Sequence, residues 1–125
     1  MLDVDVIGDA LPLGQVLEAC SLAAASAGID EGHLAVEFVD AGRIAELNLE
    51  HRGKDGPTDV LSFPVDERAE PVGPRELGDV VICPEHTEDL LEAVVHGVLH
   101  LTGMDHESDD GEMLALQAEI VGWIR

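Results

Sequence analysis

The sequence has few basic side chains, which limits the ligands that its surface can attract. Six Lys and Arg residues stand against 27 Asp and Glu residues, and the formal net charge is -21 at pH 7. Such a surface repels nucleic acid at long range, so it excludes sequence-independent binding of phosphates over a broad basic face. Any polyanion must be held at a local site, and most of the acidic residues are expected to form a solvated surface.

Cysteine is also scarce, and the two that are present exclude a disulfide framework. Cys20 falls on the apolar side of a helical pattern, and Cys83 ends an apolar, strand-like run. Both are expected to be buried thiols that pack as small hydrophobic side chains. A role for Cys83 as a fourth metal ligand is a second interpretation.

Long apolar runs are missing as well, since none approaches the ~20 residues that a membrane-spanning helix requires. The first five residues carry acids where a secretory signal would carry bases, and no long apolar core follows them. We therefore expect a cytoplasmic protein with no membrane partner. Its 125 residues are expected to form one domain, 1–125.

Hydrophobic periodicity predicts a mixed order of strands and helices along the chain. Alternating apolar residues predict strands at 2–7, 33–39, 60–63 and 77–83. Helical spacing predicts helices at 12–27, 43–52, 86–102 and from 109 onward, the last with a capping arrangement of Asp109 and Glu112. Residues 66–76, with their acids, prolines and glycine, are expected to form a polar connection.

Residues 96–106, HGVLHLTGMDH, carry the strongest chemical signal and fit the pattern H-x-x-x-H-x-x-G-x-x-H. His96 and His100 are one helical turn apart on one face, so both imidazoles can reach one ion at ~2.0–2.1 Å. Gly103 can end the helix in a left-handed conformation, which would return His106 to the same point. Three histidines with an open fourth position are typical of a catalytic zinc site.

Gly97 stands at the position that distinguishes this motif from that of zinc proteases. In those enzymes the residue after the first histidine is a glutamate that activates the zinc-bound water. Peptide hydrolysis by the usual route therefore lacks its general base here. Glycine in a helix costs ~1 kcal/mol relative to alanine, so Gly97 indicates a close approach by substrate or by another backbone segment.

These residues resemble the YbeY endoribonucleases, a family that acts in bacterial ribosomal RNA maturation. Residues 96–106 are similar to the family signature H-G-x-L-H-L-x-G-(Y/M)-D-H. Further segments match in order, namely LN at 47–48 with Arg52, TDVLSFP at 58–64 and LGDVVIC at 77–83. The resemblance covers most of the chain from around residue 34 onward, although the segment between Cys83 and His96 is shorter than is usual in the family.

The resemblance implies an α+β fold, in which a small, mostly antiparallel four-stranded sheet packs with helices and the histidine-bearing helix is central. It also implies a single-strand-specific endoribonuclease that acts in ribosomal RNA processing, late 30S maturation and ribosome quality control. One Zn²⁺ per chain would be held by His96, His100 and His106. The expected partners are single-stranded regions of the 16S rRNA precursor, with small-subunit ribosomal or assembly proteins as further candidates.

Arg52 is the expected catalytic residue beside His96. Its guanidinium could donate two hydrogen bonds to a phosphate, while zinc would act as a Lewis acid or lower the pKa of bound water to about 7. A surface arginine at a helix C-terminus is the simpler interpretation without the resemblance. The proton acceptor is open between metal-activated water, Asp105 and the RNA 2′-hydroxyl, and Asp105 is equally explained as a residue that holds a ligand or helix end in place.

Substrate contacts are less specific in the sequence, because loop capping and strand pairing explain the same residues. The expected substrate-binding residues are Asn48, Thr58, Asp59 and Ser62. His51 is a histidine outside the motif that is placed next to Arg52. A local basic spot formed by Arg43, Arg52 and Lys54, or a partner protein, would have to bring so acidic a chain to RNA.

Two other functions compete with RNA cleavage. The first is a zinc-stabilised ribosome assembly factor with little catalysis, whose acidic surface would bind basic ribosomal proteins. The second is a zinc hydrolase of another substrate, against which Gly97 and the family resemblance both argue. A comparison of RNA cleavage by the metal-loaded protein and by a His96→Ala variant would separate the three.

Overall fold

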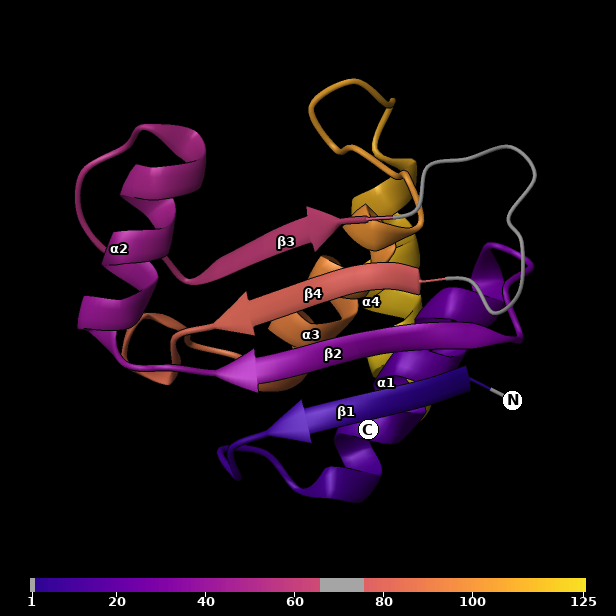
Figure 1. Cartoon of the computed structure of the whole chain (residues 1–125). Coiled ribbons are helices and arrows are strands. Elements are labelled where there is room, and N and C mark those ends of the chain that lie inside the picture. The colour runs from indigo at the N-terminus through magenta and orange to yellow at the C-terminus, as the bar shows by residue number, and fades with distance from the viewer. Residues whose placement is uncertain (1, 66–75) are drawn as a thin grey trace.

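The structure, a computed structural model, describes residues 2–65 and 76–125 and contains both strands and helices (Figure 1). The elements in chain order are β1 (Leu2–Ile7), α1 (Leu13–Ser26), β2 (Gly32–Phe38), α2 (Ala41–Arg52), β3 (Val60–Pro64), β4 (Glu76–Ile82), the 3-10 turn η1 (Pro84–His86), α3 (Leu90–Leu101) and α4 (Glu112–Ile124). The predicted α+β class is confirmed. Of the polar connection predicted at 66–76, only residue 76 lies within the described ranges, and it begins β4.

The four strands form one sheet in the order β1-β2-β4-β3. β1 pairs with β2 in parallel and β2 pairs with β4 in parallel, whereas β3 and β4 are antiparallel. The prediction of a mostly antiparallel sheet is therefore wrong. The cause lies in the connections, because α1 carries the chain back along the sheet between β1 and β2, and such a helical crossover joins parallel neighbours.

Helices α1, α3 and α4 pack on one face of the sheet, and α2 packs on the other face near β3 (Figure 1). The larger core lies under the three helices and includes Leu34, Val80 and Val94, none of which is exposed. Both cysteines are fully buried and free, as predicted, and Cys83 belongs to the smaller cluster under α2. Among the residues described, no helix has the length and apolarity to cross a membrane.

Helix α3 begins later than the sequence pattern predicts. The chain is extended at Asp89, whose carboxylate accepts a hydrogen bond from the backbone N–H of Glu92 at 3.1 Å. Arg125, which follows α4, donates to the same carboxylate at 2.6 and 2.7 Å and thereby lowers the pKa of Asp89. The capping interaction, together with this ion pair, fixes the start of α3 at Leu90 instead of His86.

Helix α4 also begins later than predicted, at Glu112 instead of Asp109. The expected capping residues still act there. The Asp109 carboxylate accepts hydrogen bonds from the backbone N–H groups of Gly111 at 2.8 Å and Met113 at 2.9 Å. The Glu112 carboxylate accepts from the N–H of Asp110, at 2.6 Å. These bonds satisfy donors at the start of the helix that would otherwise lack partners.

Gly97 allows α3 to lie directly on β4. A Cβ atom at this position would collide with the Val80 side chain, so the close approach predicted at Gly97 is made by a side chain of the sheet and not by a backbone segment. The Gly97 carbonyl also accepts a hydrogen bond from the Ser62 hydroxyl at 3.1 Å, which ties α3 to β3. The height of the histidine-bearing helix above the sheet is therefore set by the absence of a side chain at residue 97.

We predict that Gly97→Ala destabilises the fold by about 1–3 kcal/mol, because overpacking outweighs the better helix propensity of alanine. The measurement is urea unfolding of the wild type, Gly97→Ala, Val80→Ala and the double variant. Val80→Ala removes the atoms that collide with the new methyl group, so the loss in the double variant should be smaller than the sum of the two single losses. Additive losses would show that the two residues do not collide.

His33 lies on the face of the sheet opposite α1 and bridges two carboxylates. Its Nε2 is 2.8 Å from Asp5 Oδ2 and its Nδ1 is 2.6 Å from Glu76 Oε2, which joins β1, β2 and β4. Both ring nitrogens donate only when the imidazole is protonated. The hydrogen bond to Asp5, and to a smaller extent that to Glu76, raises the pKa of His33 above its usual value.

This bridge predicts a pH dependence of stability. The pKa of His33 is raised in the folded state, so its contribution to stability is complete below its ordinary pKa of 6.5. That contribution is lost as the pH rises through the pKa of the folded state. The free energies of unfolding of wild type and His33→Gln should therefore differ at pH 6 and converge toward pH 9, values chosen to bracket the titration. A difference that stays constant with pH would show that the protonated bridge does not form.

Candidate metal centre

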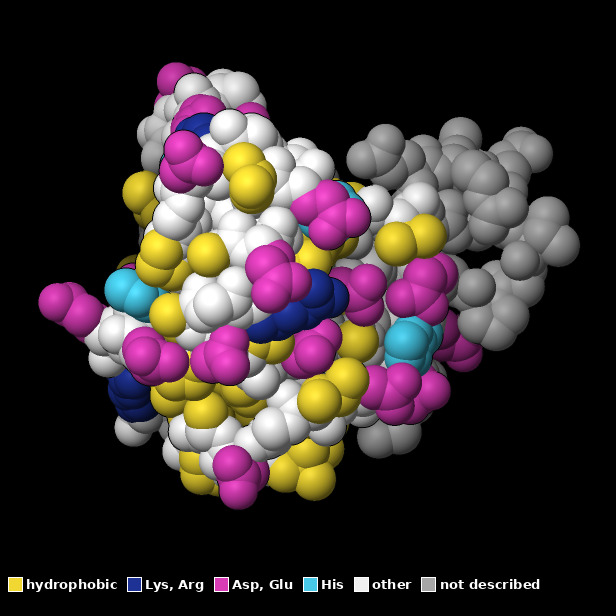
Figure 2. Space-filling view, turned by 60° about the vertical axis from the view of Figure 1, so that its left-hand side comes forward, with side chains coloured by type: hydrophobic (Ala, Val, Ile, Leu, Met, Phe, Trp, Pro, Cys, Tyr) yellow, Lys and Arg dark blue, Asp and Glu magenta, His cyan; other side chains and the backbone are white. Residues whose placement is uncertain are grey.

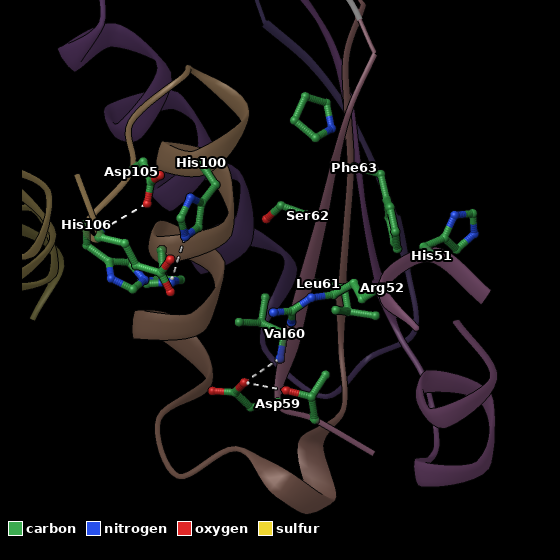
Figure 3. Close-up of a pocket in the computed structure, with 14 residues that line it drawn as sticks. His51, Arg52, Asp59, Val60, Leu61, Ser62, Phe63, His100, Asp105 and His106 are labelled. Atoms are coloured by element: carbon green, nitrogen blue, oxygen red, sulfur yellow. Dashed lines mark hydrogen bonds between the residues drawn. The ribbon is translucent and has the colours of Figure 1, made fainter. Parts of the chain in front are cut away.

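A cleft of about 810 Å³ lies beside α3 and along β3 (Figure 3). It is lined by three separate parts of the chain, namely the end of α2, the strand β3 with the two residues before it, and α3 with the loop that follows. The cleft brings together these residues predicted from the sequence: Arg52, Thr58, Asp59, Ser62, His96, His100, Asp105 and His106. Of the predicted site residues, Asn48 is the one that does not line this cleft.

The three motif histidines converge on one point in the cleft. One nitrogen from each ring lies within 4.8 Å of the others, and Nε2 of His96 is 3.2 Å from Nε2 of His100. A tetrahedral ion with ligands at 2.0–2.1 Å would hold its nitrogen atoms about 3.3 Å apart. The spacing observed between the first two ligand nitrogens thus fits a single shared ion.

The hydrogen bonds of Nδ1 in His96 and His100 determine which ring nitrogens face the point of convergence. Nδ1 of His96 is 2.7 Å from Oε1 of Gln117, and Nδ1 of His100 is 3.0 Å from the carbonyl oxygen of Met104. A carbonyl oxygen only accepts, so each Nδ1 carries a proton, and in the neutral ring Nε2 then presents a lone pair. In the neutral state of both rings, the two Nε2 lone pairs face each other at 3.2 Å and a shared cation would remove their repulsion, so this donor set fits a divalent metal.

Burial supports the same protonation state for His100. Desolvation by burial lowers the pKa of this ring, and electrostatic repulsion between the protonated forms of His100 and His96 lowers it further. Both rings are half-buried, so water only partly competes for their lone pairs. Neutral imidazole is the form that binds a metal ion.

The loop after α3 places the third histidine. Gly103 has a positive φ of +102°, and the N–H of Met104 donates to the carbonyl of Leu99 at 3.2 Å, so the chain reversal predicted at this glycine is confirmed. The carboxylate of Asp105 accepts from the N–H of Glu107 at 2.9 Å. Asp105 therefore orders the turn that carries His106.

Gln117 is the site residue that the sequence pattern did not reveal. It lies on the buried face of α4, with 8% of its surface exposed, between Met113 and Ile120. The sequence does contain one signal for Gln117: it is a polar residue at helical spacing between two apolar residues that are buried. A polar side chain in such a position needs a buried hydrogen-bond partner. Its partner is His96, which lies 21 residues earlier in the chain.

We predict that Gln117→Leu weakens binding of a divalent metal ion about 10–100-fold, since partners of this kind orient the ligand ring and fix its tautomer. Competition with a chelating dye measures the affinity. Gln117→Glu keeps an acceptor toward His96 and should retain tight binding, and Glu119→Ala is a matched control on the exposed side of α4. Metal affinity of Gln117→Leu equal to that of the wild type would contradict this role.

Arg52 is the last residue of α2, and its side chain reaches across β3 into the cleft (Figure 3). Arg43 pairs with Glu46 at 3.4 Å and Arg125 pairs with Asp89 at 2.6 Å. For Arg52, no carboxylate in residues 2–65 or 76–125 lies within ion-pairing distance. Its guanidinium is thus placed to bind an anion beside the three histidines.

The predicted basic spot is smaller than expected. Arg43 lies near the start of α2 and Arg52 at its end, about 13 Å apart at the rise of an α-helix, and Lys54 does not line the cleft. Figure 2 shows acidic side chains spread over the face that comes forward with α2, and only a few Lys and Arg side chains among them. Within the described ranges, Arg52 is therefore the basic residue that lines the cleft.

The remaining predicted substrate contacts also have structural roles. The Asp59 carboxylate accepts from the Thr58 hydroxyl at 3.2 Å and from the N–H of Val60 at 2.8 Å. The Ser62 hydroxyl donates to Gly97, as described above. Asn48 is 4% exposed, and its Nδ2 donates to the carbonyl of Gly56 at 2.9 Å, so it braces the loop before β3 from beneath.

The fold and the cleft together define an α+β protein with a three-histidine site positioned to bind a metal ion. The family model described as Endoribonuclease YbeY matches residues 13–124. Endoribonuclease YbeY of Rubrobacter xylanophilus is 45% identical over 114 residues, which cover 86% of this chain and 82% of that protein. The protein of the same name from Azorhizobium caulinodans is 40% identical over 128 residues, with coverages of 90% and 80%.

The solution structure of TM1509 from Thermotoga maritima is also similar, with a TM-score of 0.64 and 32% identity. It aligns with 99% of this chain over 89% of its own length. The chain therefore belongs to the YbeY endoribonuclease family. The resemblance seen in the sequence is confirmed.

Proposed function

We propose that this chain is a zinc-dependent, single-strand-specific endoribonuclease that processes the 16S rRNA precursor in the cytoplasm. Late 30S maturation and ribosome quality control are the processes in which it would act. The observation that carries the proposal is the convergence of one nitrogen from each of the three histidine rings, within 4.8 Å of one another, in a cleft shared with Arg52. Membership of the YbeY endoribonuclease family supports RNA as the substrate.

The residues of the cleft divide the chemical work. His96, His100 and His106 would hold Zn²⁺, which supplies Lewis-acid polarisation of a phosphoryl oxygen and lowers the pKa of water that it binds. Arg52 would bind the scissile phosphate through charge-assisted hydrogen bonds and orient it. Gln117 and the Met104 carbonyl keep two of the rings in position.

The preference for single strands follows from the charge distribution. A duplex is normally held through many phosphate contacts on a basic surface, and this acidic chain has no such surface among its described residues. A cleft with one arginine can hold one phosphate of a flexible strand whose bases are not paired. Small-subunit ribosomal or assembly proteins with basic surfaces would complement the acidic exterior and deliver the RNA.

The proposed cleavage needs a nucleophile and a group that accepts its proton. Gly97 has no side chain that could accept a proton, and it packs against Val80. The Asp105 carboxylate holds the N–H of Glu107, so its first role is to order the loop. The RNA 2′-hydroxyl and a water molecule are then the two nucleophiles to distinguish. Product analysis separates them, because attack by the 2′-hydroxyl leaves a 2′,3′-cyclic phosphate and attack by water does not.

The proposal is tested with zinc-loaded protein on one RNA sequence, presented as a single strand and as a duplex. We expect cleavage of the single strand alone and no cleavage by His96→Ala. A wild-type protein that binds zinc and ribosomal proteins but cleaves neither RNA would favour an assembly factor. Cleavage of a peptide or small ester with no cleavage of RNA would favour a hydrolase of another substrate.

A further inference from the structure

The strand β3 is an edge of the sheet, and its open edge runs along the cleft. β3 pairs with β4 on one side, and the sheet ends at β3. All five residues of β3 line the cleft, although successive side chains of a strand point to opposite faces. Side chains from both faces of a strand can line one cleft only when the cleft follows the edge of that strand. The backbone groups on the open edge of β3 therefore face the cleft.

The register shows which backbone groups point outward. The N–H of Cys83 donates to the carbonyl of Asp59 at 2.8 Å, and the N–H of Val65 donates to the carbonyl of Leu77 at 3.1 Å. The pairing between them is continuous from Val60 to Pro64. In an antiparallel pair, alternate residues direct both backbone groups to the partner, so the odd-numbered residues of β3 bond to β4 and the even-numbered residues face the cleft.

Two of the three outward positions offer no free donor. The N–H of Val60 donates to the Asp59 carboxylate at 2.8 Å, and Pro64 has no backbone N–H. The remaining donor is the N–H of Ser62, and no residue in the described parts of the chain accepts from it. An edge with a single donor does not offer the repeated pattern that an added peptide strand requires. It offers one hydrogen bond to one acceptor atom.

The position of Ser62 is fixed relative to the histidines. Its hydroxyl donates to the carbonyl of Gly97 at 3.1 Å, and Gly97 follows His96 directly in α3. Figure 3 shows the Ser62 side chain directed toward α3, and Arg52 lines the same cleft. A backbone donor held in this way loses no side-chain entropy when it binds and needs no reorganisation during a reaction.

We infer that the backbone N–H of Ser62 donates a hydrogen bond to a non-bridging oxygen of the phosphate that Arg52 binds. This inference rests on the proposed function, and it assigns a main-chain contact to Ser62, which the sequence predicts only as a substrate-binding residue. The neutral donor complements Arg52, since together they contact an anion from the strand edge and from the end of α2. The ligand class is a phosphodiester or a free phosphate.

The test compares Ser62→Pro with Ser62→Ala. Both variants lack the hydroxyl, and only the proline variant also lacks the N–H, so their difference isolates the donor. Proline fits an outward-facing position of an edge strand, and Pro64 occupies the next such position in β3. Relative to Ser62→Ala, Ser62→Pro should lower kcat/KM for single-stranded RNA about 10²-fold, mainly through kcat, with unchanged zinc content and unfolding midpoint.

Equal kcat/KM in the two variants would overturn the inference. If Ser62→Pro does not fold, a backbone ester at residue 62 replaces the N–H by oxygen, keeps the side chain and should show the same loss relative to the wild type. An ester variant with wild-type kcat/KM would overturn the inference equally. If the wild type cleaves no RNA, the proposed function fails, and the inference is then tested by binding of inorganic phosphate to the zinc-loaded protein. We expect about tenfold weaker phosphate binding without the N–H. Equal phosphate binding with and without the N–H would contradict the inference.

Discussion

Arg52→Ala should lower kcat/KM for single-stranded RNA by about 10²–10³-fold, because a positioned donor to the charge that develops in the transition state contributes on that scale. The side chain is exposed at the end of α2 and has no ion-pair partner within the described ranges. Its removal should therefore leave zinc affinity and the free energy of unfolding unchanged. Steady-state cleavage assays, zinc titration and urea unfolding measure the three quantities.

Two variants sharpen the test of Arg52. Arg52→Lys keeps the positive charge but loses the planar pair of donors, so its activity should lie between those of alanine and arginine. Arg43→Ala removes a charge of the same sign from the other end of α2, where Arg43 pairs with Glu46, and should leave cleavage unchanged. If Arg43→Ala and Arg52→Ala reduced cleavage equally, Arg52 would act only through the net charge of the protein.

The second large effect is expected from His100→Ala, which removes the ring whose Nε2 faces that of His96 at 3.2 Å. With two histidines left, zinc binding should weaken by more than about 10³-fold and RNA cleavage should be lost with it. The half-buried ring contributes little to the core, so the metal-free protein should keep its fold by circular dichroism. Elemental analysis of the purified variant gives its zinc content.

His86→Ala is the matched control for this experiment. His86 lies in the 3-10 turn before α3 and does not line the cleft. We expect its zinc content and RNA cleavage to equal those of the wild type. Zinc retained by His100→Ala at the wild-type level would show that the three rings do not share one ion.

The metal site could be predicted from the sequence because its geometry is local. Helical spacing alone places His96 and His100 on one face, and the positive φ of Gly103 returns the chain toward them. The three ligands lie within eleven consecutive residues, so no long-range packing had to be foreseen. The glycine at residue 97 indicates a close approach, but the sequence does not identify the neighbour, which is the Val80 side chain of the sheet.

Features that depend on distant parts of the chain could not be predicted in the same way. The parallel pairing of β1, β2 and β4 follows from crossover connections, which a strand pattern does not encode. Gln117 meets His96 only because α4 packs on α3. The outward N–H of Ser62 depends on the register between β3 and β4, and the buried position of Asn48 depends on the fold of the loop that follows α2.

The most direct test of the metal centre is a zinc titration of the metal-stripped protein, followed by X-ray absorption at the zinc edge. We predict one ion per chain, with three imidazole nitrogens at about 2.0–2.1 Å and a remaining position open to a small oxygen ligand. Absence of binding at one equivalent, or a first coordination shell without three imidazoles, would contradict the assignment of His96, His100 and His106.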